Sequence, residues 1–231
     1  MQFSPLRQQT TPEAAVDALR EAILSGALPQ GSQLREVHIA TEMGISRAPL
    51  REALRTLEEA GLVVKIPFRG TFVAQVSADT MAEINSLRTH LEPYAVERSL
   101  PKLLGSEAWR LDGATEALEA TVRAGDIGAS VETHLALHRL FYEHADHRLL
   151  LRMWHEWESQ LRLFFGADHA AFGHLDRIYA DHHRLVAVVK TGDLAAITAE
   201  LVEHISARYM HENEAAPAPD SDVATLEKPV G

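Results

Sequence analysis

The chain from residue 78 onward carries a helical pattern without any strand signal, and this feature limits the fold most strongly. Apolar residues recur there at helical spacing in six segments, at about 79–98, 106–124, 127–145, 147–165, 174–191 and 194–211. The breaks between them are short: Leu100-Pro101, Gly125-Asp126, Asp146, Gly166 to Gly173, and Gly192-Asp193. Because short connections join antiparallel neighbours, the sequence predicts an all-α antiparallel six-helix bundle.

The first 77 residues have a different pattern. They predict three short helices, over about 11–25, 35–43 and from Ser46 to Ala60. Two strand-like runs follow at 62–66 and 71–76, on either side of a turn at 67–70. We therefore expect a mainly α protein with an N-terminal winged helix-turn-helix, made of three helices and a β-hairpin wing. The expected domains span 8–76 and 79–212, and the polar, proline-bearing segment 213–231 is expected to be disordered.

Charge and histidine divide the chain at the same point. The net charge is −11, yet residues 1–77 hold eight basic and eight acidic residues, and the rest holds twelve of the thirteen histidines. Two regions that differ in this way are expected to have different roles. The chain has no cysteine, which excludes disulfide scaffolds, thiolate zinc fingers and iron–sulfur clusters. It also lacks a long apolar run and an apolar signal core, so we expect a cytoplasmic protein that does not contact membrane.

The third predicted helix has two distinct faces. Leucines and an alanine form its apolar face, and a stripe of arginines lies a quarter to a third of a turn away. The apolar residues are Leu50, Ala53, Leu54 and Leu57, and the arginines are Arg47, Arg51 and Arg55. Arginine suits bidentate contact with guanine edges and with phosphate, and the hairpin adds Lys65 and Arg69. The pattern predicts a DNA-reading helix, with an ordinary solvated helix face as the alternative.

Four histidines share apolar stripes on three helices of the predicted bundle. His134 and His138 stack at i and i+4 on one helix. His182 and His204 lie at matched distances from the Gly192-Asp193 turn, which places them side by side in an antiparallel pair. Four converging imidazoles suit a divalent metal such as zinc or nickel. The alternative is a set of hydrogen-bonded core histidines.

Arg88 is a further polar residue on an apolar stripe. It shares that stripe with Met81, Ile84, Leu91 and Ala95. A guanidinium in such a place needs an anionic partner. Two partners fit: an internal carboxylate, for example Glu92, or the carboxylate of a bound ligand.

The N-terminal stretch from LREAILSGALPQGSQLRE through GISRAPLREALRTLEEAGLV to RGTFV resembles the winged helix-turn-helix of GntR-type bacterial transcription regulators. The resemblance implies a homodimer that binds an inverted repeat in double-stranded operator DNA. The family often has threonine where this chain has Ala48, so the hydroxyl contact is missing there. The complete set of predicted DNA-contacting residues is Arg35, Ser46, Arg47, Ala48, Arg51, Arg55, Lys65, Arg69 and Gly70.

The second region resembles the FCD ligand-binding domain of the FadR branch, in its six-helix, VanR-like form. The resemblance rests on LRTHLEPYAVERSL, HLALHRLFYEHADHRLL and DHHRLVAVVKTGDLAAITAELVEHI. It implies a divalent metal, zinc first with nickel or manganese as alternatives, held by His134, His138, His182 and His204. Metal-binding members have an aspartate at the position of His134. The resemblance also implies a small organic acid that Arg88 anchors beside the metal.

Together these features predict a one-component transcription regulator, expected to be a repressor, whose operator affinity a small carboxylate controls. One alternative is a regulator for which the metal itself is the signal. A second is a metalloenzyme fused to a DNA-binding domain, which would need a general base near the metal. Glu132 and Glu203 adjoin the histidine stripes without sharing them, which argues against that enzyme.

Overall fold

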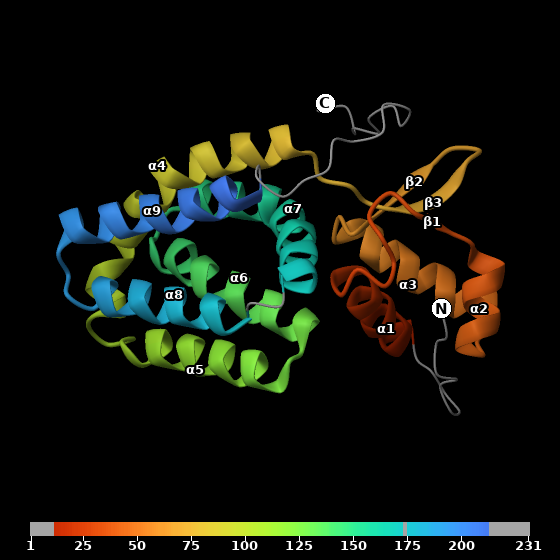
Figure 1. The fold of residues 1–231 in the computed structure, drawn as a ribbon, viewed down its shortest axis with the longest axis horizontal. Helices are drawn as coiled ribbons and strands as arrows, with labels where there is room; N and C mark the ends of the chain where they lie inside the picture. The colour runs from red at the N-terminus through yellow and green to blue at the C-terminus, as the bar shows by residue number, and fades with distance from the viewer. Residues whose placement is uncertain (1–11, 173–174, 213–231) are drawn as a thin grey trace.

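The computed structural model describes residues 12–172 and 175–212. The predicted tail 213–231 and residues 8–11 of the first predicted domain lie outside these ranges. Within them, three helices and a small sheet come first, and a bundle of six helices follows (Figure 1). The mainly helical fold class with an N-terminal winged helix-turn-helix is therefore confirmed. No helix of the described residues combines the length and apolar character that a membrane crossing requires.

The N-terminal unit contains helices α1 (Pro12–Leu24), α2 (Glu36–Met43) and α3 (Arg47–Glu59), and strands β1 (Gln33–Leu34), β2 (Val63–Ile66) and β3 (Gly70–Val73). The sheet is antiparallel with the order β1-β3-β2, and Val64 lies opposite Phe72. Helix α2 ends at Gly44, whose backbone is left-handed with φ 67°, and the chain then turns into α3. The hairpin predicted from the sequence is present, and the two-residue strand β1 adds to its β3 edge.

Helix α3 packs through one face and leaves its arginine stripe in solvent. Its buried residues are the predicted apolar set, namely Leu50, Ala53, Leu54 and Leu57. The side chains of Arg47, Arg51 and Arg55 are 56%, 60% and 70% exposed. The helix is thus held by its leucines while three guanidinium groups face outward.

The bundle contains α4 (Ala78–Leu103), α5 (Trp109–Ala124), α6 (Ile127–His144), α7 (Arg148–Phe172), α8 (Leu175–Val189) and α9 (Leu194–Glu212). Helix α6 runs through its middle and packs against α4, α5 and α7 (Figure 1). Polar side chains cap several helices: Ser77 accepts from the Thr80 N–H, and Asp126 accepts from the Ala129 N–H. These caps fix where α4 and α6 begin.

Two of the predicted helix breaks are wrong. The break at Leu100-Pro101 does not occur, because α4 continues to Leu103. Leu100 and Leu103 are buried in the bundle core, and this packing outweighs the hydrogen bond that Pro101 removes. The predicted loop from Gly166 to Gly173 is instead part of α7 as far as Phe172. Gly166 therefore has a role other than ending a helix.

Gly166 lies where α7 contacts the N-terminal unit. A Cβ atom at this position would lie 2.9 Å from the carbonyl oxygen of Leu24 and 3.1 Å from its Cα. A second contact lies beside it, because Leu163 of α7 belongs to the buried apolar cluster of the N-terminal unit. Gln30 adds a hydrogen bond from its Nε2 to the Leu163 carbonyl oxygen at 3.0 Å. Helix α7 thus joins the two units, and it stands between them in Figure 1.

Gly166→Ala is expected to lower the free energy of unfolding by about 1–3 kcal/mol, because the added methyl lies 2.9 Å from a backbone atom of Leu24 and the backbone has to shift to admit it. Chemical denaturation of the two proteins measures the difference. Gly113→Ala on α5 is the matched control, since no atom lies within 4 Å of its Cβ position. The control is expected to raise stability by about 1 kcal/mol. Equal changes in both variants would contradict the tight contact at Gly166.

Candidate metal centre and nucleic-acid interface

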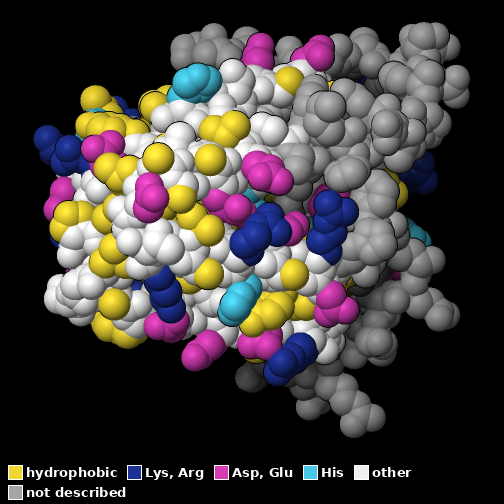
Figure 2. Space-filling model, turned by 60° about the vertical axis from the view of Figure 1, so that its left-hand side comes forward, with side chains coloured by type: hydrophobic (Ala, Val, Ile, Leu, Met, Phe, Trp, Pro, Cys, Tyr) yellow, Lys and Arg dark blue, Asp and Glu magenta, His cyan; other side chains and the backbone are white. Residues whose placement is uncertain are grey.

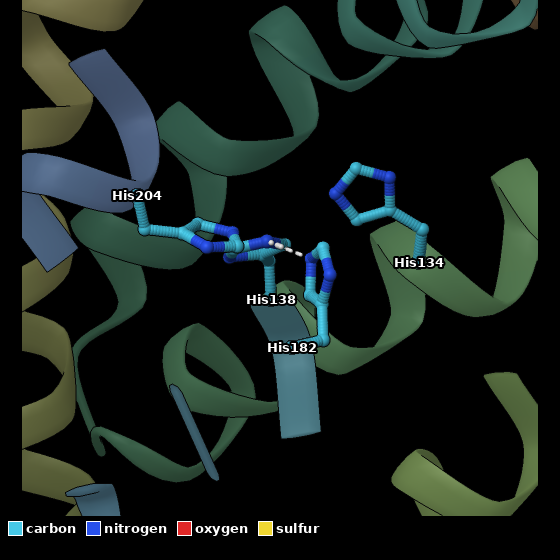
Figure 3. Close-up of side chains that lie close together, drawn as sticks. All are labelled: His134, His138, His182 and His204. Carbon is cyan, nitrogen blue, oxygen red and sulfur yellow. Dashed lines mark hydrogen bonds between the residues drawn. The ribbon is translucent and has the colours of Figure 1, made fainter. Parts of the chain in front are cut away.

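Four buried histidines meet inside the bundle. His134 and His138 come from α6, His182 from α8 and His204 from α9, and their exposed fractions are 0%, 0%, 0% and 5%. One ring nitrogen of each lies within 4.8 Å of one nitrogen of every other. The rings point toward a common space between the helices (Figure 3). The rings of His182 and His204 lie 4.5 Å apart, as their matched distances from the interhelical turn predict. His183, which the sequence places off this stripe, is exposed.

Hydrogen bonds fix which ring nitrogen faces the common space in two of these histidines. The Nδ1–H of His182 donates to the Ile178 carbonyl oxygen at 2.6 Å, and the Nδ1–H of His138 donates to Glu92. In a neutral ring this leaves Nε2 with a lone pair. The two Nε2 atoms are 3.0 Å apart. Two lone pairs at that distance repel one another unless a proton or a metal ion lies between the rings.

The residues fit a divalent metal by the chemistry of their donors. Neutral imidazoles suit zinc, nickel and copper, and metal-bound histidines commonly donate their second N–H to a carboxylate or a carbonyl oxygen. His138 and His182 both do so. With bonds of about 2.0–2.1 Å, a metal places two donors no more than about 4.2 Å apart. The widest separation in the cluster, up to 4.8 Å, therefore has to shorten slightly on binding.

Arg88 pairs with a buried carboxylate, which is one of the two partners that the sequence allows. Its Nε donates a hydrogen bond to Oε2 of Glu92 at 3.2 Å, its Nη2 forms an ion pair with the same oxygen at 3.2 Å, and both side chains are almost completely buried. Burial raises the pKa of the Glu92 carboxyl, but electrostatic attraction and hydrogen bonds from His138 and Arg88 lower that pKa below its usual range. Glu92 is therefore an ionised group in the interior, with a partner on each oxygen.

One pocket brings Arg88 and the histidines together. Its walls are Asn85, Arg88, His134, His138, Phe164, Phe165, His204 and Ile205. The guanidinium of Arg88 and the imidazoles therefore line the same pocket, and apolar side chains form another part of its wall. Of the aromatic residues of α7, Phe164 and Phe165 line the pocket, whereas Trp154 and Trp157 are core residues.

Sequence reasoning missed a fifth buried histidine. His169 stacks on His134 with ring centroids 5.6 Å apart, and its Nδ1 lies 3.0 Å from the Ser130 hydroxyl. The segment around it was expected to be a loop, so its helical stripe was not considered. The contact between Glu92 and His138 was also missed from the sequence, because that contact depends on how α4 packs against α6.

All nine residues predicted to contact DNA are exposed. They lie on the N-terminal unit, in α3, at the start of α2 and α3, and in the hairpin. Arg47 and Arg51 both donate to Glu36, at 3.4 and 2.8 Å, and Arg55 pairs with Glu59 at 2.8 Å. The hydrogen bond from Arg51 lowers the pKa of Glu36, despite an opposing effect of burial. The ionised Glu36 thus holds two of the arginines in one orientation.

The surface of the bundle carries charges of both signs, unlike the arginine stripe of α3. On the face drawn in Figure 2, Lys and Arg side chains alternate with Asp and Glu side chains among apolar ones. The acidic residue Glu132, considered as a base for a metalloenzyme, instead accepts from Arg162 at 2.7 Å.

Family models match both units of the chain. The model described as "Bacterial regulatory proteins, gntR family" matches residues 11–73, and the FCD domain model matches residues 83–207. The chain belongs to the GntR family. Its helical bundle is an FCD domain, so the resemblance noted in the sequence is confirmed. The family is one of transcription regulators, which makes this GntR/FCD protein a regulator and not an enzyme.

Relatives and solved structures agree with this assignment. The "Probable D-xylose utilization operon transcriptional repressor" of Paenarthrobacter nicotinovorans is 27% identical over 87% of this chain and 88% of its own length. The gluconate operon transcriptional repressor of Bacillus subtilis is 24% identical over 79% and 77%. The structure of Escherichia coli McbR/YncC is similar, with a TM-score of 0.66, 21% identity and coverage of 90% of this chain and 99% of that one. This last likeness shows the shared fold.

Proposed function

We propose that this regulator is a homodimeric repressor whose operator affinity is controlled by a small organic acid bound beside a divalent metal, with zinc as the resident ion. Residues 8–76 form its DNA-binding domain and residues 79–212 its effector domain. The observation that carries the proposal is the pocket in which Arg88 faces His134, His138 and His204. A carboxylate is the ligand that complements both a guanidinium and a metal ion. Phe164, Phe165 and Ile205 form the apolar wall of the same pocket, and they have to move apart before the rest of a small acid can enter.

In this proposal the protein's own residues hold each part of the assembly. Four imidazoles hold the metal, which supplies a positive charge for the acid, and Arg88 supplies the second anchor. On the DNA side, the exposed arginines of α3 read base edges and phosphates in the major groove. Lys65, Arg69 and Gly70 of the wing approach the backbone.

Helix α7 gives the acid a route to the DNA-reading unit. Phe164 and Phe165 line the pocket, while the preceding residue, Leu163, packs in the N-terminal core. A shift of this turn of α7 on binding the acid therefore displaces the unit that carries α3. Such a shift changes operator affinity only to the extent that the acid binds one arrangement of the dimer better than the other.

Operator release tests the proposal. An operator is selected from random DNA with the metal-loaded protein, and its binding is followed by fluorescence anisotropy while mono- and dicarboxylates are added at millimolar concentration. The expected result is that at least one acid releases the DNA. In Arg88→Met, the concentration of that acid needed for half-maximal release is expected to be at least tenfold higher. If instead added metal alone changes operator affinity and none of the acids does, the metal is the signal and the acid-controlled repressor is wrong.

A further inference from the structure

Glu92 lies between Arg88 and His138 and contacts both. Its Oε2 accepts a hydrogen bond from Nε of Arg88 and forms an ion pair with Nη2, and its Oε1 accepts from Nδ1 of His138. The side chain has no exposed surface. A buried carboxylate is costly unless hydrogen-bond donors satisfy both of its oxygens, and this one has a donor on each oxygen.

The orientation of His138 depends on this carboxylate. An ionised carboxylate only accepts hydrogen bonds, so the proton of a neutral His138 ring lies on Nδ1. The Nε2 atom is then the one directed at His182, 3.0 Å away in the histidine cluster. A carboxylate on the far nitrogen of an imidazole also makes the near nitrogen a stronger donor to a metal.

We propose that Glu92 is a positioning residue that fixes the metal-binding state of His138 and links it to Arg88. The proposal rests on the metal site of the proposed function. In this arrangement the guanidinium of Arg88 orients the carboxylate, and the carboxylate orients the imidazole. A carboxylic acid that binds at Arg88 consequently alters metal binding by His138 through Glu92. No direct contact between the acid and His138 is needed.

Glu92→Gln tests this role, because glutamine keeps the size of the side chain and removes its charge. Zinc affinity is measured by competition with a chromophoric chelator in wild-type protein, Glu92→Gln and Glu97→Gln. Glu97 is the matched control, since it lies on the same helix and is exposed. We expect zinc affinity to fall about 10- to 100-fold in Glu92→Gln and to stay within twofold in Glu97→Gln.

A second measurement needs no variant and applies even where Glu92→Gln fails to fold. Long-range ¹⁵N NMR of zinc-loaded wild-type protein is expected to show a proton on Nδ1 of His138 and a metal-shifted Nε2. An unprotonated Nδ1, or equal zinc affinity in wild type and a folded Glu92→Gln, would overturn the role of Glu92 alone. Failure of the wild type to bind zinc would overturn the metal site itself, and the two failures are thus distinguishable.

Discussion

Replacing both Arg47 and Arg51 with alanine is expected to weaken operator binding by about 100- to 10,000-fold. Each arginine that contacts a guanine edge in bidentate fashion contributes about 1–3 kcal/mol of discrimination. The two side chains extend from the exposed face of α3, and Glu36 holds both of them in place. Leu50 and Leu54, which hold the helix in the core, lie on the adjoining buried face, so the change should leave folding intact.

Anisotropy titrations at one fixed salt concentration measure this loss, because phosphate contacts make affinity strongly salt-dependent. Arg123→Ala is the control for loss of an exposed arginine, since this residue of α5 is 76% exposed and pairs only with Glu119 on its own helix among the interactions of the described residues. Its operator affinity is expected to stay within twofold of wild type. A double variant that binds the selected operator as tightly as the control would show that α3 does not read the DNA.

His138→Ala is the second change with a large expected effect. His138 lies at the centre of the site: its Nδ1 is held by Glu92, its Nε2 faces His182, and its ring is 5.3 Å from that of His204. Structural zinc sites with four ligands bind with about 10–16 kcal/mol of apparent free energy. Loss of one of four ligands is therefore expected to weaken binding by several kcal/mol, enough to remove the metal during purification.

The local patterns of the sequence were sufficient for most of the elements and for much of the site. The face of α3 that is buried follows from the spacing of its leucines, and that spacing is set by the helix alone. The meeting of His182 with His204 follows from equal distances to one tight turn, because an antiparallel pair brings equal depths together. Arg88 was predicted to point inward because it lies on an apolar helical stripe, and its side chain is buried.

Features set by packing between distant segments were not accessible in this way. Gly166 was predicted to end a helix. The sequence alone does not distinguish a glycine that ends a helix from one that lets a neighbouring backbone approach closely. Strand β1 has only two residues and exists because β3 pairs with it. His169 was assigned to a loop for the same reason as Gly166, and its contact with His134 was missed with it.

The metal content of the purified protein tests the central claim most directly. The wild type, His138→Ala and His183→Ala are purified without a histidine tag or chelator, and bound metals are counted by elemental analysis. His183 is the matched control because it neighbours His182 and is exposed. The account predicts about one divalent metal per chain in the wild type and in His183→Ala, and none in His138→Ala. A wild-type protein that holds no metal and takes up none when zinc is added would contradict it.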